Sequence, residues 1–172
     1  DEFFVFILAL NKIKENKNKN LNEYIIEEKY FKECETIIEK LPYKLTNAQL
    51  KAINEIKEDL KSKYIMNRLI QGDVGSGKTI VALIAALNAA ECKLQTAFMA
   101  PTDTLAQQHY AKIKPICDEL GVVCDILTGR DKGATQKEKL ISIRSGRTRI
   151  VIGTHALFQE AVEYKDLALV II

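Results

Sequence analysis

An octapeptide in the middle of the chain constrains the fold more than any other feature. Residues 72–79 read Gly-Asp-Val-Gly-Ser-Gly-Lys-Thr, which fits the pattern G-x-x-x-x-G-K-S/T of phosphate-binding loops. Gly75 and Gly77 permit backbone angles that side chains disfavour, so successive N–H groups can point at one anion. The apolar segment from Lys78 to Ala90 predicts a helix, whose N-terminus adds the positive end of its dipole. The octapeptide therefore predicts a site for the phosphates of a nucleotide.

Two side chains of this loop carry the predicted chemistry, and they are our candidate catalytic residues. The Lys78 ammonium would lie on the β- and γ-phosphates of ATP. The Thr79 hydroxyl would ligate Mg²⁺, so ATP and Mg²⁺ are the expected cofactors. The predicted cofactor-binding residues of the loop are Gly72, Asp73, Val74, Gly75, Ser76, Gly77, Lys78 and Thr79.

Predicted helices and strands alternate from about Thr46 onward. Besides the helix after the loop, the predicted helices are one that Thr46 caps and that runs to Leu60, one from about Asp103 to Leu120 in which Pro115 weakens the last turns, and Gln136–Ser145. The predicted strands are Asn67–Gln71, Thr96–Ala100, Val122–Leu127, Ile150–Ile152 and Leu169–Ile172. This alternation is typical of an α/β fold with a parallel sheet and helices on both faces. Ligands of such folds bind at the carboxyl ends of the strands.

The first 41 residues differ from the rest, so we divide the chain into a helical segment, 1–41, and an α/β domain, 42–172. The apolar run Phe3–Leu10 predicts a helix and is far shorter than the roughly 20 residues of a membrane span. A charged linker, Lys12–Asn20, separates it from a second predicted helix, about Asn22–Glu39. We therefore expect no membrane contact.

Composition and cysteine spacing exclude some classes of protein. The formal net charge is only +2, so any DNA-binding prediction must rest on particular residues. The cysteines are Cys34, Cys92, Cys117 and Cys124, which form no C-x-x-C pair. This spacing argues against a zinc site, and we expect buried, reduced thiols of a cytoplasmic protein.

Four further motifs resemble those of superfamily 2 helicases. Leu45–Gln49 is similar to the adenine-recognising Q motif, and Ala100-Pro101-Thr102 to motif Ia. Thr128-Gly129 is similar to motif Ib, and Gly153-Thr154-His155 to the next DNA-contacting motif. The resemblance implies a P-loop NTPase (RecA-like) fold, the first motor domain of a helicase. The particular residues of these motifs resemble those of the RecG family of bacterial ATP-dependent DNA helicases, and the resemblance spans nearly the whole chain.

The resemblance also implies roles for residues that are ambiguous by themselves. Gln49 would bind the N6 and N7 edge of adenine, although without the resemblance it is an ordinary exposed helix residue. The implied DNA-binding residues are Pro101, Thr102, Thr128, Gly129, Gly153, Thr154 and His155. Each threonine taken alone is more typical of a helix cap or a turn, and His155 fits a packed loop residue equally well.

The family function that the resemblance implies is ATP-dependent translocation on double-stranded DNA. Such a helicase remodels branched DNA, including stalled forks and Holliday junctions, in repair and recombination. We expect a monomer in the bacterial cytoplasm. In this family an Asp-Glu pair follows the strand that ends near Ile172, and no such pair follows it in these residues. We therefore interpret the chain as a truncated motor domain that binds nucleotide without hydrolysing it.

Three alternatives remain open at this point. The motor of transcription-repair coupling factor is similar, but it usually carries an aromatic residue where Ser76 stands. A P-loop kinase would need a lid and an acceptor pocket, which the sequence does not indicate. A nucleotide-binding module without enzymatic activity would describe the behaviour of the truncated domain.

Overall fold

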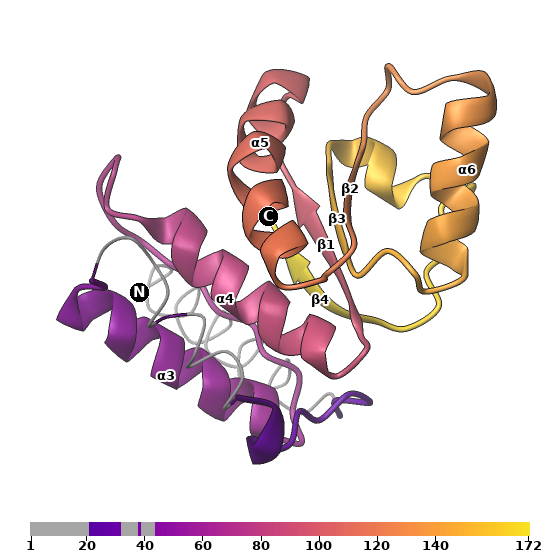
Figure 1. The fold of residues 1–172 in the computed structure, drawn as a ribbon. Coiled ribbons are helices and arrows are strands. Elements are labelled where there is room, and N and C mark those ends of the chain that lie inside the picture. Colours follow the sequence, from indigo (N-terminus) through magenta and orange to yellow (C-terminus); the bar gives the residue numbers. More distant parts are fainter. Residues whose placement is uncertain (1–20, 32–37, 39–43) are drawn as a thin grey trace, which may run out of the picture.

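The computed structural model describes residues 21–31, 38 and 44–172. In these residues, four strands form one parallel sheet in the order β2-β3-β1-β4 (Figure 1). The strands are β1 (Gln95–Met99), β2 (Cys124–Leu127), β3 (Ile150–Gly153) and β4 (Leu167–Ile171). The α-helices are α3 (Asn47–Lys61), α4 (Lys78–Glu91), α5 (Asp103–Glu119) and α6 (Gly133–Arg144), and two short 3-10 helices are η1 (Glu28–Tyr30) and η2 (His155–Phe158). The predicted helix Phe3–Leu10 and the linker Lys12–Asn20 lie outside the described residues.

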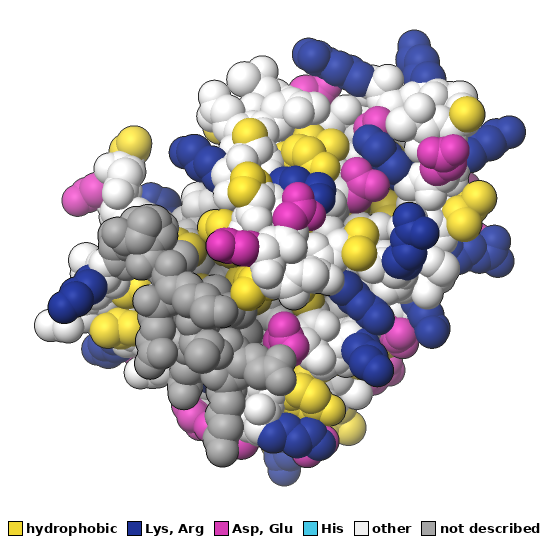
Figure 2. All heavy atoms as spheres, viewed as in Figure 1, with side chains coloured by type: hydrophobic (Ala, Val, Ile, Leu, Met, Phe, Trp, Pro, Cys, Tyr) yellow, Lys and Arg dark blue, Asp and Glu magenta, His cyan; other side chains and the backbone are white. Residues whose placement is uncertain are grey.

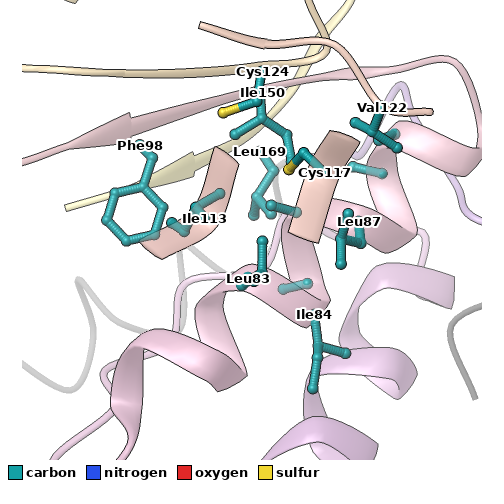
Figure 3. Packing of buried hydrophobic residues seen from close by; sticks show 14 of the residues in the cluster. Leu83, Ile84, Leu87, Phe98, Ile113, Cys117, Val122, Cys124, Ile150 and Leu169 are labelled. Atoms are coloured by element: carbon teal, nitrogen blue, oxygen red, sulfur yellow. The ribbon is translucent and has the colours of Figure 1, made fainter. Parts of the chain in front are cut away.

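Alternate residues of the strands face two separate cores, as the pleat of a sheet requires. Phe98 and Ile150 pack with α3, α4 and α5 in the larger core (Figure 3). Ala97 and Val151 pack on the other face with Ile143 of α6. Figure 1 shows α6 across the sheet from α4. The predicted parallel sheet with helices on both faces is therefore confirmed.

Two helices, α3 and α5, begin where the sequence predicts, and a side chain caps each of them. The Thr46 hydroxyl accepts a hydrogen bond from the Gln49 N–H, and the Gln49 side chain accepts one from the Thr46 N–H, which completes a capping box. The Thr102 hydroxyl accepts from the Leu105 N–H at the start of α5. This helix continues through Pro115 to Glu119.

The predicted strand Asn67–Gln71 is wrong, because this segment lies outside the sheet. Among the described residues, β4 pairs only with β1. The unpaired segment leaves Leu69 88% exposed, and Val170 on β4 is 44% exposed. An apolar run forms a strand only when a neighbouring strand accepts its hydrogen bonds, and the residues of the run alone do not supply that neighbour.

The predicted helix Asn22–Glu39 is wrong in its first part. Residues 22–27 are not helical, residues 28–30 form η1, and the described residues Phe31 and Ile38 are helical. The Asn22 N–H donates to the Lys63 carbonyl at 2.8 Å, and the Ile26 N–H donates to the Leu60 carbonyl at 3.1 Å. These bonds hold the segment at the C-terminal end of α3, where Ile26 is buried. Residues 32–37 and 39 lie outside the described part.

The three cysteines that the structure describes are free, and two of them are buried as predicted, whereas Cys92 is only partly buried. Cys117 on α5 and Cys124 on β2 are buried and free, and Figure 3 shows their sulfur atoms close to each other. The hydrogen bond with Cys117, together with burial, raises the pKa of the Cys124 thiol. Cys34 lies outside the described residues. Within those residues, no helix is long and apolar enough to cross a membrane.

Two buried amides differ sharply in how they are paired. Gln95, at the start of β1, is 0% exposed and donates to the carbonyls of Ile143 and Thr148 at 2.8 and 2.9 Å. Its side-chain oxygen accepts from the backbone N–H groups of Lys165 and Asp166. Gln95 therefore joins the ends of three segments that meet at the amino edge of the sheet. Asn88 on α4 is 1% exposed, and neither atom of its amide has a hydrogen-bond partner among the described residues.

We expect Gln95→Leu and Asn88→Leu to change stability very differently. Gln95→Leu leaves backbone groups without partners and should lower the free energy of unfolding by about 3 kcal/mol. Asn88→Leu removes an amide that forms no bond and should leave that free energy unchanged or raise it. Urea unfolding of both variants beside the unmodified chain checks this, and equal losses in the two variants would contradict it.

Candidate nucleotide-binding site

The backbone of the loop has the shape that the octapeptide predicts. Gly75 has φ 83° and Gly77 has φ 81°, both in the left-handed region that residues with a Cβ rarely adopt. Gly77 is the N-cap of α4, so the first N–H groups of that helix face the loop. A phosphate bound there would receive these N–H groups together with the positive end of the α4 dipole.

The Lys78 side chain folds back over this loop. Its ammonium donates to the carbonyl oxygens of Gly72 and Asp73 at 2.6 and 2.8 Å. The positive charge of Lys78 is therefore held against the loop by two neutral carbonyl oxygens. A phosphate oxygen is a stronger acceptor for an ammonium than a carbonyl oxygen is. The arrangement fits a lysine that exchanges carbonyl partners for the phosphates of a nucleotide.

Gln49 ties the start of α3 to the loop. Its side-chain NH₂ donates to the Ser76 carbonyl at 2.9 Å, while its oxygen accepts from the Thr46 N–H at 2.8 Å. A Cβ on Gly77 would lie 2.3 Å from the side-chain nitrogen of Gln49, so a side chain at this position would displace the Gln49 amide from the loop. The contact places Gln49, the predicted adenine-binding residue, beside the predicted phosphate-binding loop. The reading of adenine itself remains a prediction.

One cavity contains both predicted parts of the nucleotide site. Its volume is about 660 Å³, within the range of sites for small molecules. The predicted site residues that line it are Gln49, Gly75, Gly77, Lys78 and Thr79. Lys78 and Thr79 also line a second cavity of about 350 Å³, next to β4 and the segment 66–70. Thr79 therefore lines both cavities, and its binding of Mg²⁺ remains a prediction.

The predicted DNA-binding residues lie at the carboxyl edge of the sheet, because each of them ends or follows a parallel strand. Pro101, Thr102, Gly129 and His155 are exposed there. Thr128 and Thr154 are only 3% and 4% exposed. Topology brings these three loops together as predicted, but it buries two of the three threonine side chains. Contact of these residues with DNA remains a prediction.

Gly153 has a packing role that spacing along the sequence did not reveal. It is the last residue of β3, and a Cβ there would overlap the Leu127 carbonyl oxygen of β2. The same Cβ would lie 2.9 Å from the side chain of Leu157. Since the obstacle is backbone, no rotation of a side chain relieves it. Gly153 therefore allows β2 and β3 to end side by side.

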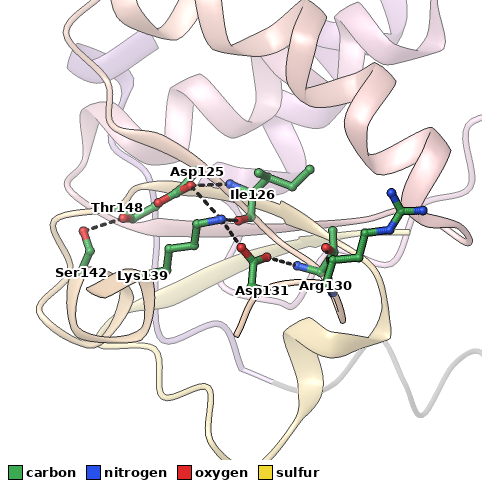
Figure 4. Close-up of polar contacts among 8 residues, drawn as sticks. Asp125, Ile126, Arg130, Asp131, Lys139, Ser142 and Thr148 are labelled. Atoms are coloured by element: carbon green, nitrogen blue, oxygen red, sulfur yellow. Dashed lines mark hydrogen bonds and ion pairs between the residues drawn. The ribbon is translucent and has the colours of Figure 1, made fainter. Parts of the chain in front are cut away.

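A polar network behind the loop after β2 was also missed by the sequence analysis. Lys139 of α6 bonds to Asp131 and to the Ile126 carbonyl, as Figure 4 shows. The eight-residue separation of Lys139 from Asp131 fits no helical pairing rule, so the sequence carries no local signal for it. At the opposite, amino edge of the sheet, Arg144 pairs with Glu163 at 3.1 Å.

A known protein family matches the part of the chain that contains these motifs. Residues 46–172, well over half of the chain, match the DEAD/DEAH box helicase family. The chain belongs to this family. A helicase family of this kind uses ATP, so the predicted nucleotide site and the family agree.

Named relatives refine the family assignment. The ATP-dependent DNA helicases RecG of Aquifex aeolicus and Thermotoga maritima are 44% and 46% identical over 100% of this chain. The chain spans 22% of the length of each of these two helicases. The solved structure of RecG bound to a three-way DNA junction matches 98% of this chain and 23% of that chain, with 43% identity and a TM-score of 0.86. The resemblance to RecG helicases is confirmed.

A more distant solved structure supports the fold alone. A hypothetical ATP-dependent RNA helicase from Sulfolobus tokodaii matches 77% of this chain at 21% identity, with a TM-score of 0.55. The match covers 37% of the chain of that RNA helicase. The parallel sheet with helices on both faces is thus shared beyond the RecG helicases.

Two glycines that the resemblance groups together should respond differently to substitution. Gly153→Ala forces β2 and β3 apart and should lower the free energy of unfolding by about 3 kcal/mol, the upper part of the range for overpacking. Gly129→Ala is the matched control, because nothing lies within 4 Å of a Cβ there. It should change that free energy by less than about 0.5 kcal/mol. Thermal or urea unfolding measures both, and a stable Gly153→Ala variant would contradict the packing role.

Proposed function

We propose that this chain is the nucleotide-binding part of the first motor domain of an ATP-dependent DNA helicase. The parent protein would hydrolyse ATP to translocate on double-stranded DNA and would remodel stalled forks and Holliday junctions in repair and recombination. The observation that carries the proposal is the Gln49–Ser76 bond, which joins the Q motif and the phosphate loop in one cavity. The family match and the RecG relatives support it.

The DNA substrate of the proposal rests on a relative. The solved RecG structure holds a three-way DNA junction, and its match covers 98% of this chain. We infer that the parent protein acts on branched DNA as well. As in the sequence analysis, we propose a monomer in the bacterial cytoplasm.

Each residue of the nucleotide site has a proposed task. The Lys78 ammonium leaves the carbonyls of Gly72 and Asp73 for the β- and γ-phosphates, and the N–H groups at the start of α4 hold the same oxygens. Bound Mg²⁺ would supply charge that offsets the phosphates, and Thr79 is the residue that would hold it. Gln49 exchanges its present partners for the edge of adenine.

Lys78→Ala tests the phosphate site. A charge contact at about 4 Å is worth on the order of 4 kcal/mol at an effective dielectric of 20. We therefore expect ATP and ADP affinity to fall by at least about 100-fold, measured by isothermal titration calorimetry. Lys137→Ala, which removes the same charge from the exposed face of α6, should leave affinity unchanged. Equal affinity of Lys78→Ala and the unmodified chain would contradict the proposal.

The 172-residue chain alone should bind nucleotide without turning it over. Phosphoryl transfer needs a carboxylate to hold Mg²⁺ and a group to orient water, and no Asp-Glu pair follows β4 in these residues. We expect phosphate release at the background rate, with or without branched DNA. Release that rises when DNA is added to the purified chain would show that another residue supplies the missing group.

A further inference from the structure

The turn after β2 is held in one shape by its own backbone and by Asp131. The Thr128 N–H donates to one carboxylate oxygen of Asp131 at 2.8 Å, and the Asp131 N–H donates to the Thr128 carbonyl at 3.1 Å. The Arg130 N–H donates to the Thr128 hydroxyl at 3.3 Å. These three bonds close the turn Thr128–Asp131 on itself.

Lys139 fixes this turn to α6. Its ammonium lies 2.6 Å from the second carboxylate oxygen of Asp131 and donates to the Ile126 carbonyl at 2.7 Å. Both side chains are largely buried, with 17% of Lys139 and 13% of Asp131 exposed. A buried ion pair that also satisfies backbone groups fixes geometry better than a surface pair does. The Asp131 carboxylate is thus bonded on both oxygens, as Figure 4 shows.

The fixed turn presents Arg130 to solvent. Figure 4 shows its guanidinium pointing away from the network. The Arg130 side chain is 77% exposed, and its Nε lies 3.2 Å from the carboxylate of Asp103. Asp103 is the first residue of α5 and directly follows Thr102. The Arg130–Asp103 pair therefore spans the gap between the loops that follow β1 and β2, at the carboxyl edge of the sheet.

The threonines at this edge are poorly placed to bind phosphate through their side chains. Thr128 and Thr154 are nearly buried, and the Thr102 hydroxyl already caps α5. Affinity for a DNA backbone comes mainly from Lys and Arg that neutralise phosphates. On the face that Figure 2 shows, basic and acidic side chains are interspersed.

We propose that Arg130 is a DNA-phosphate ligand at this edge, that Asp103 is its partner when DNA is absent, and that Asp131 and Lys139 are positioning residues that aim it. The inference rests on the proposed function, since it assumes that DNA runs along the carboxyl edge. An exposed Arg–Asp pair contributes little to stability, so exchanging the carboxylate for a phosphate costs little. A guanidinium can also bind a phosphate through two parallel N–H bonds.

Arg130→Ala and Asp103→Asn test the inference by the opposite signs of their effects. Arg130→Ala should weaken binding of a labelled three-way DNA junction about tenfold, as the loss of one charged hydrogen bond implies. It should also reduce the dependence of log affinity on log salt by about one phosphate contact. Asp103→Asn should tighten binding about twofold or more, because it removes the competing carboxylate. Fluorescence anisotropy of the 172-residue chain with the junction measures both.

Arg144→Ala is the matched control. Arg144 is 73% exposed and pairs with Glu163 at 3.1 Å, so its loss removes the same charge and a similar ion pair from the far end of α6. It should change junction affinity by less than about twofold. Asp131→Asn keeps an oxygen for the Thr128 N–H but weakens the bond to Lys139, so it should weaken junction binding while ADP affinity stays unchanged.

The possible results distinguish a failure of this inference from a failure of the proposed function. Equal losses in Arg130→Ala and Arg144→Ala would show general attraction only and would overturn the inference. Weaker binding in both Arg130→Ala and Asp103→Asn would show that their pair is merely structural, which also overturns it. A chain that binds ADP and no junction overturns the inference and leaves the nucleotide site standing. A chain that binds neither contradicts the proposed function as well.

Discussion

The parallel direction of the four strands is the constraint on which the rest of the structure depends. Because β1, β2 and β3 run the same way, the loops that follow them all emerge at one edge of the sheet. Helices α5 and α6 then return along opposite faces to the amino edge, where Gln95 bonds the segments that enter β3 and β4. One edge is thus fixed by a buried amide and a dense core. The other is left to loops, which is where an α/β fold binds its ligands.

The nucleotide loop belongs to this edge although its preceding segment lies outside the sheet. Three contacts hold it: α4 begins at its last glycine, Lys78 bonds back to its first carbonyls, and Gln49 bonds to Ser76 from α3. Each of these groups can also serve a ligand, because a helix N-terminus, an ammonium and an amide are donors for phosphate or base. The interactions that shape the loop are therefore the ones that a nucleotide would take over. This shared use connects the stability of the loop to its proposed function.

Sequence patterns predicted most of the fold because they reflect local physics. The apolar run after Lys78 and the cap at Thr46 determine where α4 and α3 begin, and the positive φ of Gly75 and Gly77 follows from the octapeptide. The errors arise where residues far apart in the sequence determine the local structure. Asn67–Gln71 has the composition of a strand, but no strand in the described part of the chain pairs with it. Residues 22–27 bond to the end of α3 and not to each other. Gln95, Gly153 and Lys139 act through residues that are close only after folding, so no spacing along the chain revealed them.

The central claim is that the backbone N–H groups of residues 75–79 form an anion site. The most direct measurement is a titration of the ¹⁵N-labelled chain with Mg²⁺–ADP, followed by the amide signals of Gly75, Gly77 and Lys78. These N–H groups would acquire charged acceptors, so the account predicts large downfield amide proton shifts in this loop. It predicts small shifts at Gly121, in the turn after α5, and at Gly133, the first residue of α6. Saturable binding that moves other amides and leaves the loop signals in place would contradict the account.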